Sequence, residues 1–276
     1  MRGIVGSLWL FAAVLVPCAT AQSRLAAGVS AGAVKLTDQR SEQALSAIVE
    51  YLPYPWLSLS AIPSLLHISD QVSGRSVSSN GPGDVPVVAA ASHAFATPGT
   101  PSVGAALMVV LPAGNAACGL GSGQTSLGFD VGAGIAPTGG VRLSADVSRS
   151  FSGFAQSSLD APGATTLRVE AGYDISPRWT ASASLGADVG TSDSTQALSR
   201  VIGVGASHAL RGPLALTISS THGLTAASPQ WVVSVAIGTV FTGTSPVAPT
   251  TPLRQLKTVF AGGVNRGSGA GKTGCP

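Results

Sequence analysis

Apolar and polar residues alternate one by one through much of the chain. In residues 167–175, every odd position is apolar or aromatic, and Arg168, Glu170 and Asp174 fall at even positions. Residues 125–135, 141–151 and 179–189 show the same pattern. Successive side chains of a β-strand point to opposite faces, whereas helical spacing would distribute these charges around an axis. The pattern therefore predicts strands with one apolar face and one polar face.

Extending the same criterion along the chain predicts twelve strands of lengths that suit a tilted crossing of the hydrocarbon layer. Alternation is only partial in the first four. We predict strands near residues 25–36, 42–51, 54–67, 82–95, 99–112, 124–136, 139–151, 165–175, 178–190, 197–209, 212–222 and 229–241.

The predicted connections alternate between long and short. The longer ones cover residues 70–80, 113–123, 152–164, 191–196 and 223–229, and the shorter ones cover 52–53, 96–99, 137–140, 176–177 and 211–213. Bacterial outer-membrane barrels have short periplasmic turns and longer extracellular loops. The pattern thus predicts an even number of strands with both barrel termini in the periplasm.

The composition favours a membrane protein without spanning helices. Charged residues make up 10% of the chain, against about 25% in soluble domains, and the mean hydropathy is +0.38. A closed barrel is the alternative to helices for satisfying the backbone in lipid. We predict an all-β fold, a transmembrane antiparallel β-barrel of about twelve strands in the cell outer membrane. Trp56, Trp179 and Trp231 are expected near its periplasmic strand ends; a soluble secreted β-sandwich is the alternative fold.

The two ends of the chain differ from its centre. Arg2, an apolar run over residues 8–16 and the small residues Ala19 and Ala21 predict a signal peptide over residues 1–21, cleaved before the barrel of residues 22–241. Residues 242–276 are rich in Gly, Pro, Ser and Thr and are predicted to be disordered. The sequence leaves open whether Cys118 and Cys275, which remain after cleavage, form a disulfide.

Charged side chains share the polar face of the central strands. They would line the lumen, either holding the barrel rigid or forming a constriction that selects solutes. A hairpin centred near Ser158 would place Arg142 opposite Asp174 and Asp146 opposite Glu170. The lumen-lining candidates are Asp130, Arg142, Asp146, Arg168, Glu170, Asp174 and Asp188.

No catalytic or metal-binding pattern accompanies these charges. His67, His93, His208 and His222 are isolated in the sequence, without a recognisable metal pair or triad. The net charge of +3 is small and dispersed, which argues against a nucleic-acid partner. We therefore expect no enzyme activity, metal or cofactor.

Two short motifs resemble those of a known family. Gly81-Pro82-Gly83-Asp84 opens a predicted strand, and residues 111–125 read LPAGNAACGLGSGQT. Both resemble motifs of the outer-membrane barrel family named for the meta-pathway of phenol degradation, although Ala113 replaces the usual Thr. The matching loop residues are Leu111, Pro112, Gly114, Gly119, Gly121, Ser122, Gly123, Gln124 and Thr125.

The resemblance implies a transporter or channel, in some members for aromatic compounds. We therefore expect passive passage of small solutes, hydrophobic or aromatic ones included, with a non-conducting structural barrel as the alternative. Phe241 closes the last predicted strand and resembles the signal read by barrel-assembly machinery. That machinery, outer-membrane lipid and an unidentified small solute are the expected partners.

Overall fold

The computed structural model describes residues 24–72, 75–137, 139–152, 165–189, 199–226 and 228–239. The predicted signal peptide, the predicted disordered tail with Phe241, and nearly all of the predicted loops 152–164 and 191–196 lie outside these residues.

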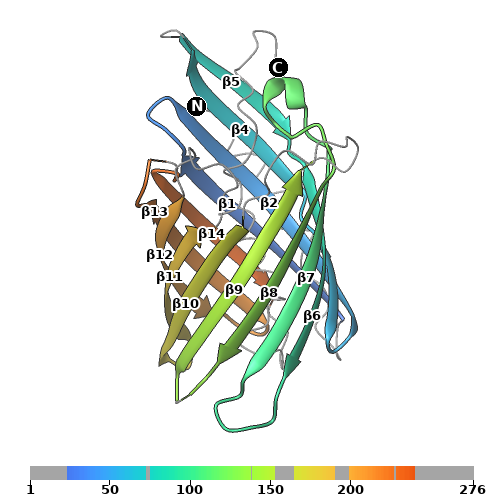
Figure 1. The fold of residues 1–276 in the computed structure, drawn as a ribbon, viewed down its shortest axis with the longest axis vertical. Coiled ribbons are helices and arrows are strands. Elements are labelled where there is room, and N and C mark those ends of the chain that lie inside the picture. Colours follow the sequence, from blue (N-terminus) through green and yellow to red (C-terminus); the bar gives the residue numbers. More distant parts are fainter. Residues whose placement is uncertain are drawn as a thin grey trace.

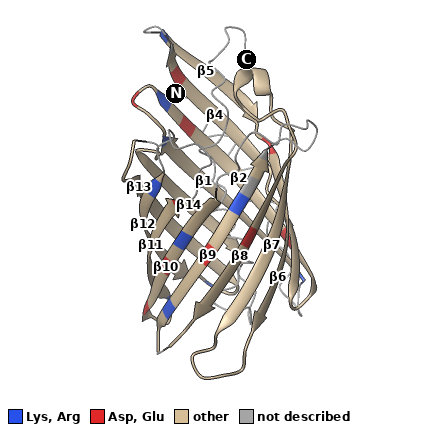
Figure 2. Cartoon of the chain, viewed as in Figure 1, with Lys and Arg blue, Asp and Glu red and all other residues tan. Residues whose placement is uncertain are grey.

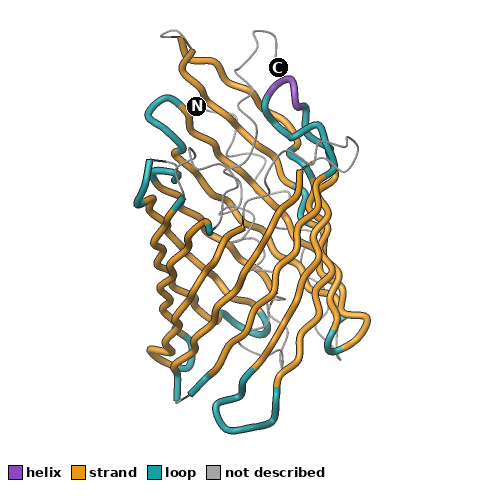
Figure 3. Tube along the Cα trace, in the orientation of Figure 1, coloured by secondary structure: helices purple, strands orange, loops and turns teal. Residues whose placement is uncertain are grey.

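Strands dominate the described residues (Figure 1), and one short 3-10 helix, η1, connects two of them (Figure 3). The elements are β1 (Leu25–Lys35), β2 (Arg40–Tyr54), β3 (Leu57–Ala61), β4 (Ser64–Val72), β5 (Arg75–Pro82), β6 (Val85–Ala94), β7 (Ser102–Leu111), η1 (Ala116–Cys118), β8 (Ser126–Ile135), β9 (Val141–Ser152), β10 (Thr165–Ser176), β11 (Trp179–Asp188), β12 (Arg200–Ala209), β13 (Leu214–Gly223) and β14 (Trp231–Thr239).

The sheet closes on itself. All pairings are antiparallel, in the order β1-β14-β13-β12-β11-β10-β9-β8-β7-β6-β3-β2-β4-β5, and β1 pairs with β2 as well as with β14. The closing register runs from Gly28 opposite Gly238 to Lys35 opposite Trp231. Closure leaves no unpaired edge, which is the condition for a sheet to cross a membrane.

Two barrel strands are interrupted. β3 and β4 pair with β2 in one continuous register, and Pro63, which has no N–H to donate, falls at the break between them. β5 and β6 are separated by Gly83 and Asp84, where the register shifts by one residue, as in a β-bulge. Each pair therefore makes one strand, and the barrel has twelve. The predicted fold class is confirmed.

One predicted connection was wrong. Residues 70–80 were expected to form a loop, but β4 continues to Val72 and β5 begins at Arg75, with Asp70 opposite Val77 and Ile68 opposite Ser79. This hairpin rises above its neighbours at the long-loop end of the barrel (Figure 1). Because it is mostly polar, apolar alternation does not reveal it.

Large apolar side chains cover the outside of the barrel. Ile175 is 63% exposed, Val204 60% and Leu185 58%, and exposed apolar residues occur at alternate positions of most strands. So extensive an apolar surface is unfavourable in water and favourable in hydrocarbon. The barrel therefore belongs in a membrane. No helix among the described residues is both long and apolar enough to cross a membrane.

Exposed aromatic residues gather at the end of the barrel with the short turns. Tyr54 and Trp56 stack with ring centroids 5.5 Å apart, and the other members are Tyr51, Phe95, Tyr173 and Trp179. Aromatic girdles mark the interfaces of membrane barrels. Trp231 was expected at this end as well, but it lies at the opposite, long-loop end, where it pairs with Lys35 and His222.

Candidate functional site in the barrel interior

The seven predicted lumen residues share the inward face of β8–β11, where they alternate with outward apolar residues. Arg168, Glu170 and Asp174 alternate on β10 with Leu167, Val169 and Tyr173, which are 38–56% exposed. Red and blue segments on β8, β9 and β10 mark several of these charges between the two ends of the barrel (Figure 2). Asp130, Arg142, Asp146 and Asp188 occupy equivalent positions on β8, β9 and β11.

One group of these residues is joined near the short-turn end. The Arg142 guanidinium forms a two-pronged ion pair with the Asp174 carboxylate, one bond being 3.1 Å from Nη1 to Oδ2. Arg142 Nη2 also donates to Thr180 Oγ1 at 3.1 Å, and the Thr180 hydroxyl donates to Asp174 Oδ1 at 2.7 Å. β9, β10 and β11 are thus linked through a single cluster on the inner wall.

The predicted register of β9 and β10 was wrong by two residues. Asp146 lies opposite Arg168 rather than Glu170, and Arg142 lies opposite Gly172 and reaches Asp174 diagonally. A shift of two residues keeps every side chain on the same face, so alternation alone cannot detect it. The actual register places opposite charges directly across from each other at Asp146 and Arg168.

The inner face also carries charges that sequence reasoning missed. Arg40 donates to Glu42 at 2.9 Å on β2. Glu50, further along the same strand, is 0% exposed, and Asp70 shares the inner face of β4. Arg40, Glu42 and Glu50 all lie at even positions of β2, which could have indicated a shared face, but apolar residues on both faces of this strand obscure the pattern.

The inner wall is predominantly acidic. Among the described strands, its carboxylates are Glu42, Glu50, Asp70, Asp130, Asp146, Glu170, Asp174 and Asp188, and its arginines are Arg40, Arg75, Arg142 and Arg168. Apart from Asp70 and Arg75, whose hairpin rises above the neighbouring strands, these groups face one enclosed space, where screening by salt is weaker than at an open surface. The interior potential is therefore negative.

Hydroxyl groups line the opposite wall, formed by β12–β14 and β1–β4. Ser219 and Ser234 are hydrogen bonded at 2.7 Å, as are Ser207 and Thr217. The hydroxyls of Ser30 and Ser46 are buried without a hydrogen-bond partner, and the Glu50 carboxylate is fully buried beside the Ser58 hydroxyl. This wall combines polar groups with small or branched apolar residues such as Ile48 and Ile62.

The two motif segments meet at the long-loop end. Asp84, in the bulge between β5 and β6, accepts hydrogen bonds through Oδ1 from the Gly114 N–H at 3.0 Å and through Oδ2 from the Ser122 N–H at 2.7 Å. The Ser122 hydroxyl lies 2.8 Å from the same Oδ2. A single carboxylate therefore fixes both ends of the β7–β8 loop.

The motif glycines make this contact possible. A Cβ on Gly121 would lie 2.2 Å from Asp84 Oδ1, and one on Gly114 would lie 2.4 Å from the Leu120 carbonyl oxygen. Gly119 and Gly123 have positive φ angles of 71° and 69°, which glycine adopts without a steric penalty. Of the other motif residues, Leu111 ends β7, Pro112 follows it, the Gln124 N–H donates to Ser122 Oγ at 3.3 Å, and Thr125 precedes β8.

The same loop turns two residues toward the barrel axis. Cys118 is 7% exposed and Leu120 3%, and both pack against Leu66 and Ile68 of β4. Leu66 and Ile68 belong to the inner face, since Leu65 between Ser64 and Leu66 is 52% exposed on the outside. Cys118 is disulfide-bonded, and it is the one cysteine among the described residues.

The histidines do not form a site. His93 contacts Phe95 edge-on, His208 lies against Trp179 at 4.4 Å between ring centroids, and His67 Nδ1 lies 2.6 Å from Asn80 Oδ1. His222 pairs with Trp231 across β13 and β14. Within the described part of the chain, no group of three or more His, Cys, Asp or Glu side chains is placed to hold a metal ion.

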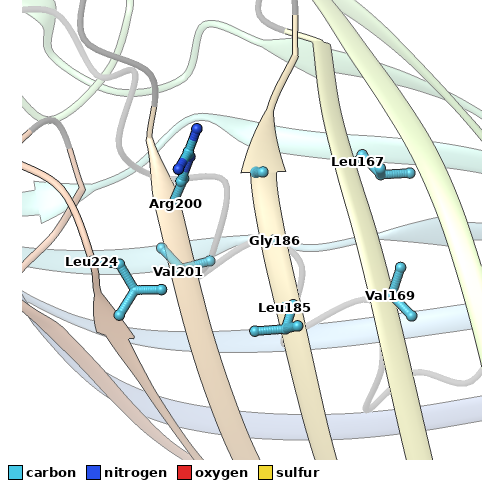
Figure 4. Close-up of a pocket in the computed structure, with 8 residues that line it drawn as sticks. Leu167, Val169, Leu185, Gly186, Arg200, Val201 and Leu224 are labelled. Carbon is cyan, nitrogen blue, oxygen red and sulfur yellow. The ribbon is translucent and has the colours of Figure 1, made fainter.

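A shallow depression crosses β10, β11 and β12 near their long-loop ends (Figure 4). Leu167, Val169, Leu185 and Leu224 line it, with Arg200 at its edge. These four side chains are 38–58% exposed on the outer surface. The depression is therefore part of the membrane-facing surface and not of the interior.

The fold defines a class: a twelve-stranded outer-membrane β-barrel. It is similar to an outer membrane channel from Pseudomonas putida F1 at 15% identity, with a TM-score of 0.61 over 82% of this chain and 99% of that one. It is also similar to KdgM porin at 13% identity, with a TM-score of 0.52 over 78% and 99% of the chains. No protein-family model and no curated protein matches the sequence.

Proposed function

We propose that the barrel is a passive channel for small hydrophilic solutes and that it conducts cations in preference to anions. The observation that supports this proposal is the acidic excess of the inner wall, eight carboxylates against four arginines on the described strands. Rings or walls of carboxylates attract cations into pores and repel anions. A solute that enters the lumen gives up hydrogen bonds with water, and the hydroxyls of the opposite wall can replace them.

The structural neighbours support a channel in general and no particular solute. The hydrophobic or aromatic solutes implied by the resemblance remain a prediction of that resemblance, because the described inner wall is mainly hydroxyl, carboxylate and small apolar side chains. Membership of the meta-pathway family is likewise proposed, with support from the contact of Asp84 with the loop residues Gly114 and Ser122. We also propose that barrel-assembly machinery inserts this protein into the membrane, as it would for a member of that family.

The test is the reversal potential of single channels in planar bilayers across a gradient of potassium chloride. We expect a permeability ratio that favours potassium. Asp146→Asn and Glu170→Gln, which remove inner-wall charge while keeping the side-chain shape, should each move the ratio toward chloride. Asp38→Asn, which changes a carboxylate in the β1–β2 loop, should leave it unchanged.

Three outcomes would contradict parts of this proposal. A folded barrel without conductance would favour the structural role, and heat-modifiable migration on gels would establish that the barrel is folded. Conductance without a preference for potassium would remove the selectivity and retain the channel. Faster swelling of proteoliposomes with aromatic solutes than with sugars of similar size would favour the solute class implied by the resemblance.

A further inference from the structure

The depression on the outer surface of β10, β11 and β12 has a small residue at its centre (Figure 4). Ala187 of β11 pairs with Leu167 of β10 on one side and with Arg200 of β12 on the other. Leu224, just beyond the end of β13, continues this outward row, since its N–H donates to the Arg200 carbonyl oxygen at 2.8 Å. A single methyl group between larger side chains leaves an apolar groove that is open to the membrane.

Arg200 places a positive charge at the edge of this groove. It is the first residue of β12 and is exposed. Figure 4 shows its guanidinium extending toward the long-loop end, away from Leu185 and Leu224. An outward arginine costs much less near the interface than at mid-membrane, and its long stem lets the charge reach the headgroup layer. The guanidinium therefore lies at the depth of lipid headgroups, and the groove lies at the depth of acyl chains.

Arg200 differs from the other cations on the outside of the barrel. The outward basic residues of the described strands are Lys35, Arg149 and Arg200, each within three residues of the long-loop end of its strand. Lys35 lies 3.4 Å from Asp38, and the Arg149 guanidinium lies 5.3 Å above the centre of the Phe151 ring. Within the described part of the chain, the Arg200 guanidinium has no ion pair or hydrogen bond. It is therefore free to bind an external anion.

The outer surface of the described strands offers no competing negative charge. Every Asp and Glu of these strands lies on the inner face, and Asp38 and Asp84 lie in the β1–β2 loop and in the bulge between β5 and β6. A guanidinium binds phosphate through two parallel hydrogen bonds. A lipid with a phosphate and an acyl chain therefore matches both the charged edge and the apolar groove.

We propose that this groove binds a phosphorylated glycolipid of the outer leaflet, with an acyl chain over Ala187 and a phosphate held by Arg200. The occupant comes from the outer leaflet because the longer loops of outer-membrane barrels are extracellular. A lipid that binds the folded barrel and not the unfolded chain also stabilises the fold. The site lies outside the barrel and does not depend on the proposed channel.

The test is native mass spectrometry of the full-length protein in detergent, mixed with equal amounts of lipid A, dephosphorylated lipid A and phosphatidylcholine. We expect one lipid A to be retained in preference to the other two. Arg200→Gln should reduce its retention several-fold because the phosphate loses its partner. Ala187→Leu should reduce it as well, because the larger side chain fills the groove while the outer surface stays apolar.

Two further variants make the test specific. Arg178→Gln is the matched control, because Arg178 is an exposed arginine in the turn at the other end of β10 and β11; it should retain lipid A as the native protein does. Arg200→Lys keeps the charge without the two parallel donors and should retain an intermediate amount. Heat-modifiable migration on gels establishes that each variant is folded.

Equal retention of lipid A by the native protein, Arg200→Gln and Ala187→Leu would overturn the site. An equal loss in Arg178→Gln would overturn it too, because the lipid would then respond to net charge and not to this groove. Retention of dephosphorylated lipid A as firmly as lipid A would overturn the role of Arg200. None of these results alters the conductance expected of the proposed channel.

Discussion

The two walls of the barrel have similar outsides and different insides. Val169 of β10 and Val235 of β14 are 46% and 43% exposed, so both walls present apolar residues to lipid. Inside, β8–β11 carry long charged side chains that are mostly half-buried, with Asp146 at 9% exposed. The wall of β12–β14 and β1 carries buried serines, alanines and valines, and the inward charges of β2 and β4 lie beyond it. Lipid imposes one requirement on every strand, whereas the interior is free to differ from one side to the other.

This difference separates a charged wall, β8–β11, from a hydroxyl wall, β12–β14 with β1. Ser182 of the charged wall faces inward between two glycines, Gly172 of β10 and Gly205 of β12, which add no side chain beside it. On the hydroxyl wall, the inner residues Ser234 and Ala236 are 8% and 7% exposed. The charged wall should therefore accept larger inward side chains, and the hydroxyl wall should not.

The largest expected effect comes from placing arginine at an outward and at an inward position of each wall. Val169→Arg and Val235→Arg each place a charge against lipid and should lower the free energy of unfolding by about 2–4 kcal/mol. Ser182→Arg should have a small effect, because the new cation faces the carboxylates of the charged wall. Ser234→Arg should cost about 1–3 kcal/mol through overpacking. Denaturant unfolding in phospholipid vesicles measures all four.

Equal costs for Ser182→Arg and Ser234→Arg would abolish the distinction between the walls. A small cost for Val169→Arg or Val235→Arg would show that the corresponding face does not meet hydrocarbon. Val169→Ile is the matched control, because it keeps the outward surface apolar.

The next effect concerns the loop that joins β7 to β8, the first strand of the charged wall. Gly121→Ala would bring a Cβ to 2.2 Å from Asp84 Oδ1, so the carboxylate must move and lose its hydrogen bonds. The loss of a hydrogen bond to a charged group lowers the free energy of unfolding by about 1.5–3 kcal/mol. We expect faster hydrogen exchange at the Gly114 and Ser122 amides. Gly139→Ala is the control, since no atom lies within 4 Å of the added Cβ; equal protection in both variants would contradict the role of Asp84.

The contrast between the walls also explains what the sequence could predict. On β10 the inward residues are charged and the outward residues apolar, so the alternation is strong and the strand was located within one residue. On β2, Ile48 faces inward and Val49 outward, so the polarity difference between the faces disappears. The charges Glu42 and Glu50 were missed for this reason.

Contacts between residues distant in the sequence could not be predicted from the alternation of apolar and polar residues. Both motif segments were recognisable in sequence, but their meeting at Asp84 depends on the bulge at Gly83 and on the fold of the β7–β8 loop. The pairing of Asp146 with Arg168 depends on the register of β9 and β10, which a period of two leaves undetermined. The face of a side chain follows from the sequence pattern, and its partner follows from the packing of whole strands.

A smaller effect compares one polar pair from each wall. Ser219→Ala on the hydroxyl wall leaves the Ser234 hydroxyl buried without its partner, at a cost of about 1 kcal/mol, and the double variant should recover much of it. Arg142 and Asp174 on the charged wall are 28% and 35% exposed, so solvent screening should hold their coupling to about 1 kcal/mol or less. Double-mutant cycles from denaturant unfolding measure both couplings. A much larger coupling for Arg142 and Asp174 would show that the charged wall is as dry as the hydroxyl wall.

The smallest effect is expected at Asp38, where the loops above the hydroxyl wall meet. Asp38 accepts a hydrogen bond from Gln230 at 3.0 Å and lies 3.4 Å from Lys35 Nζ. The bond from Gln230, and secondly the Lys35 charge, lower the pKa of the Asp38 carboxyl below 3.8. A carboxyl with a lowered pKa in the folded protein stabilises it above the unfolded pKa, and this contribution is lost as the pH falls through the folded pKa. The melting temperature of the native protein should therefore slightly exceed that of Asp38→Asn near neutral pH, and the difference should shrink as the pH falls below 3.8 and vanish below the folded pKa. If the difference in melting temperature is the same at every pH, the charge of Asp38 does not stabilise the pairing of β1 with β14. The contact of Asp38 with Gln230 would then depend only on packing and on an uncharged hydrogen bond.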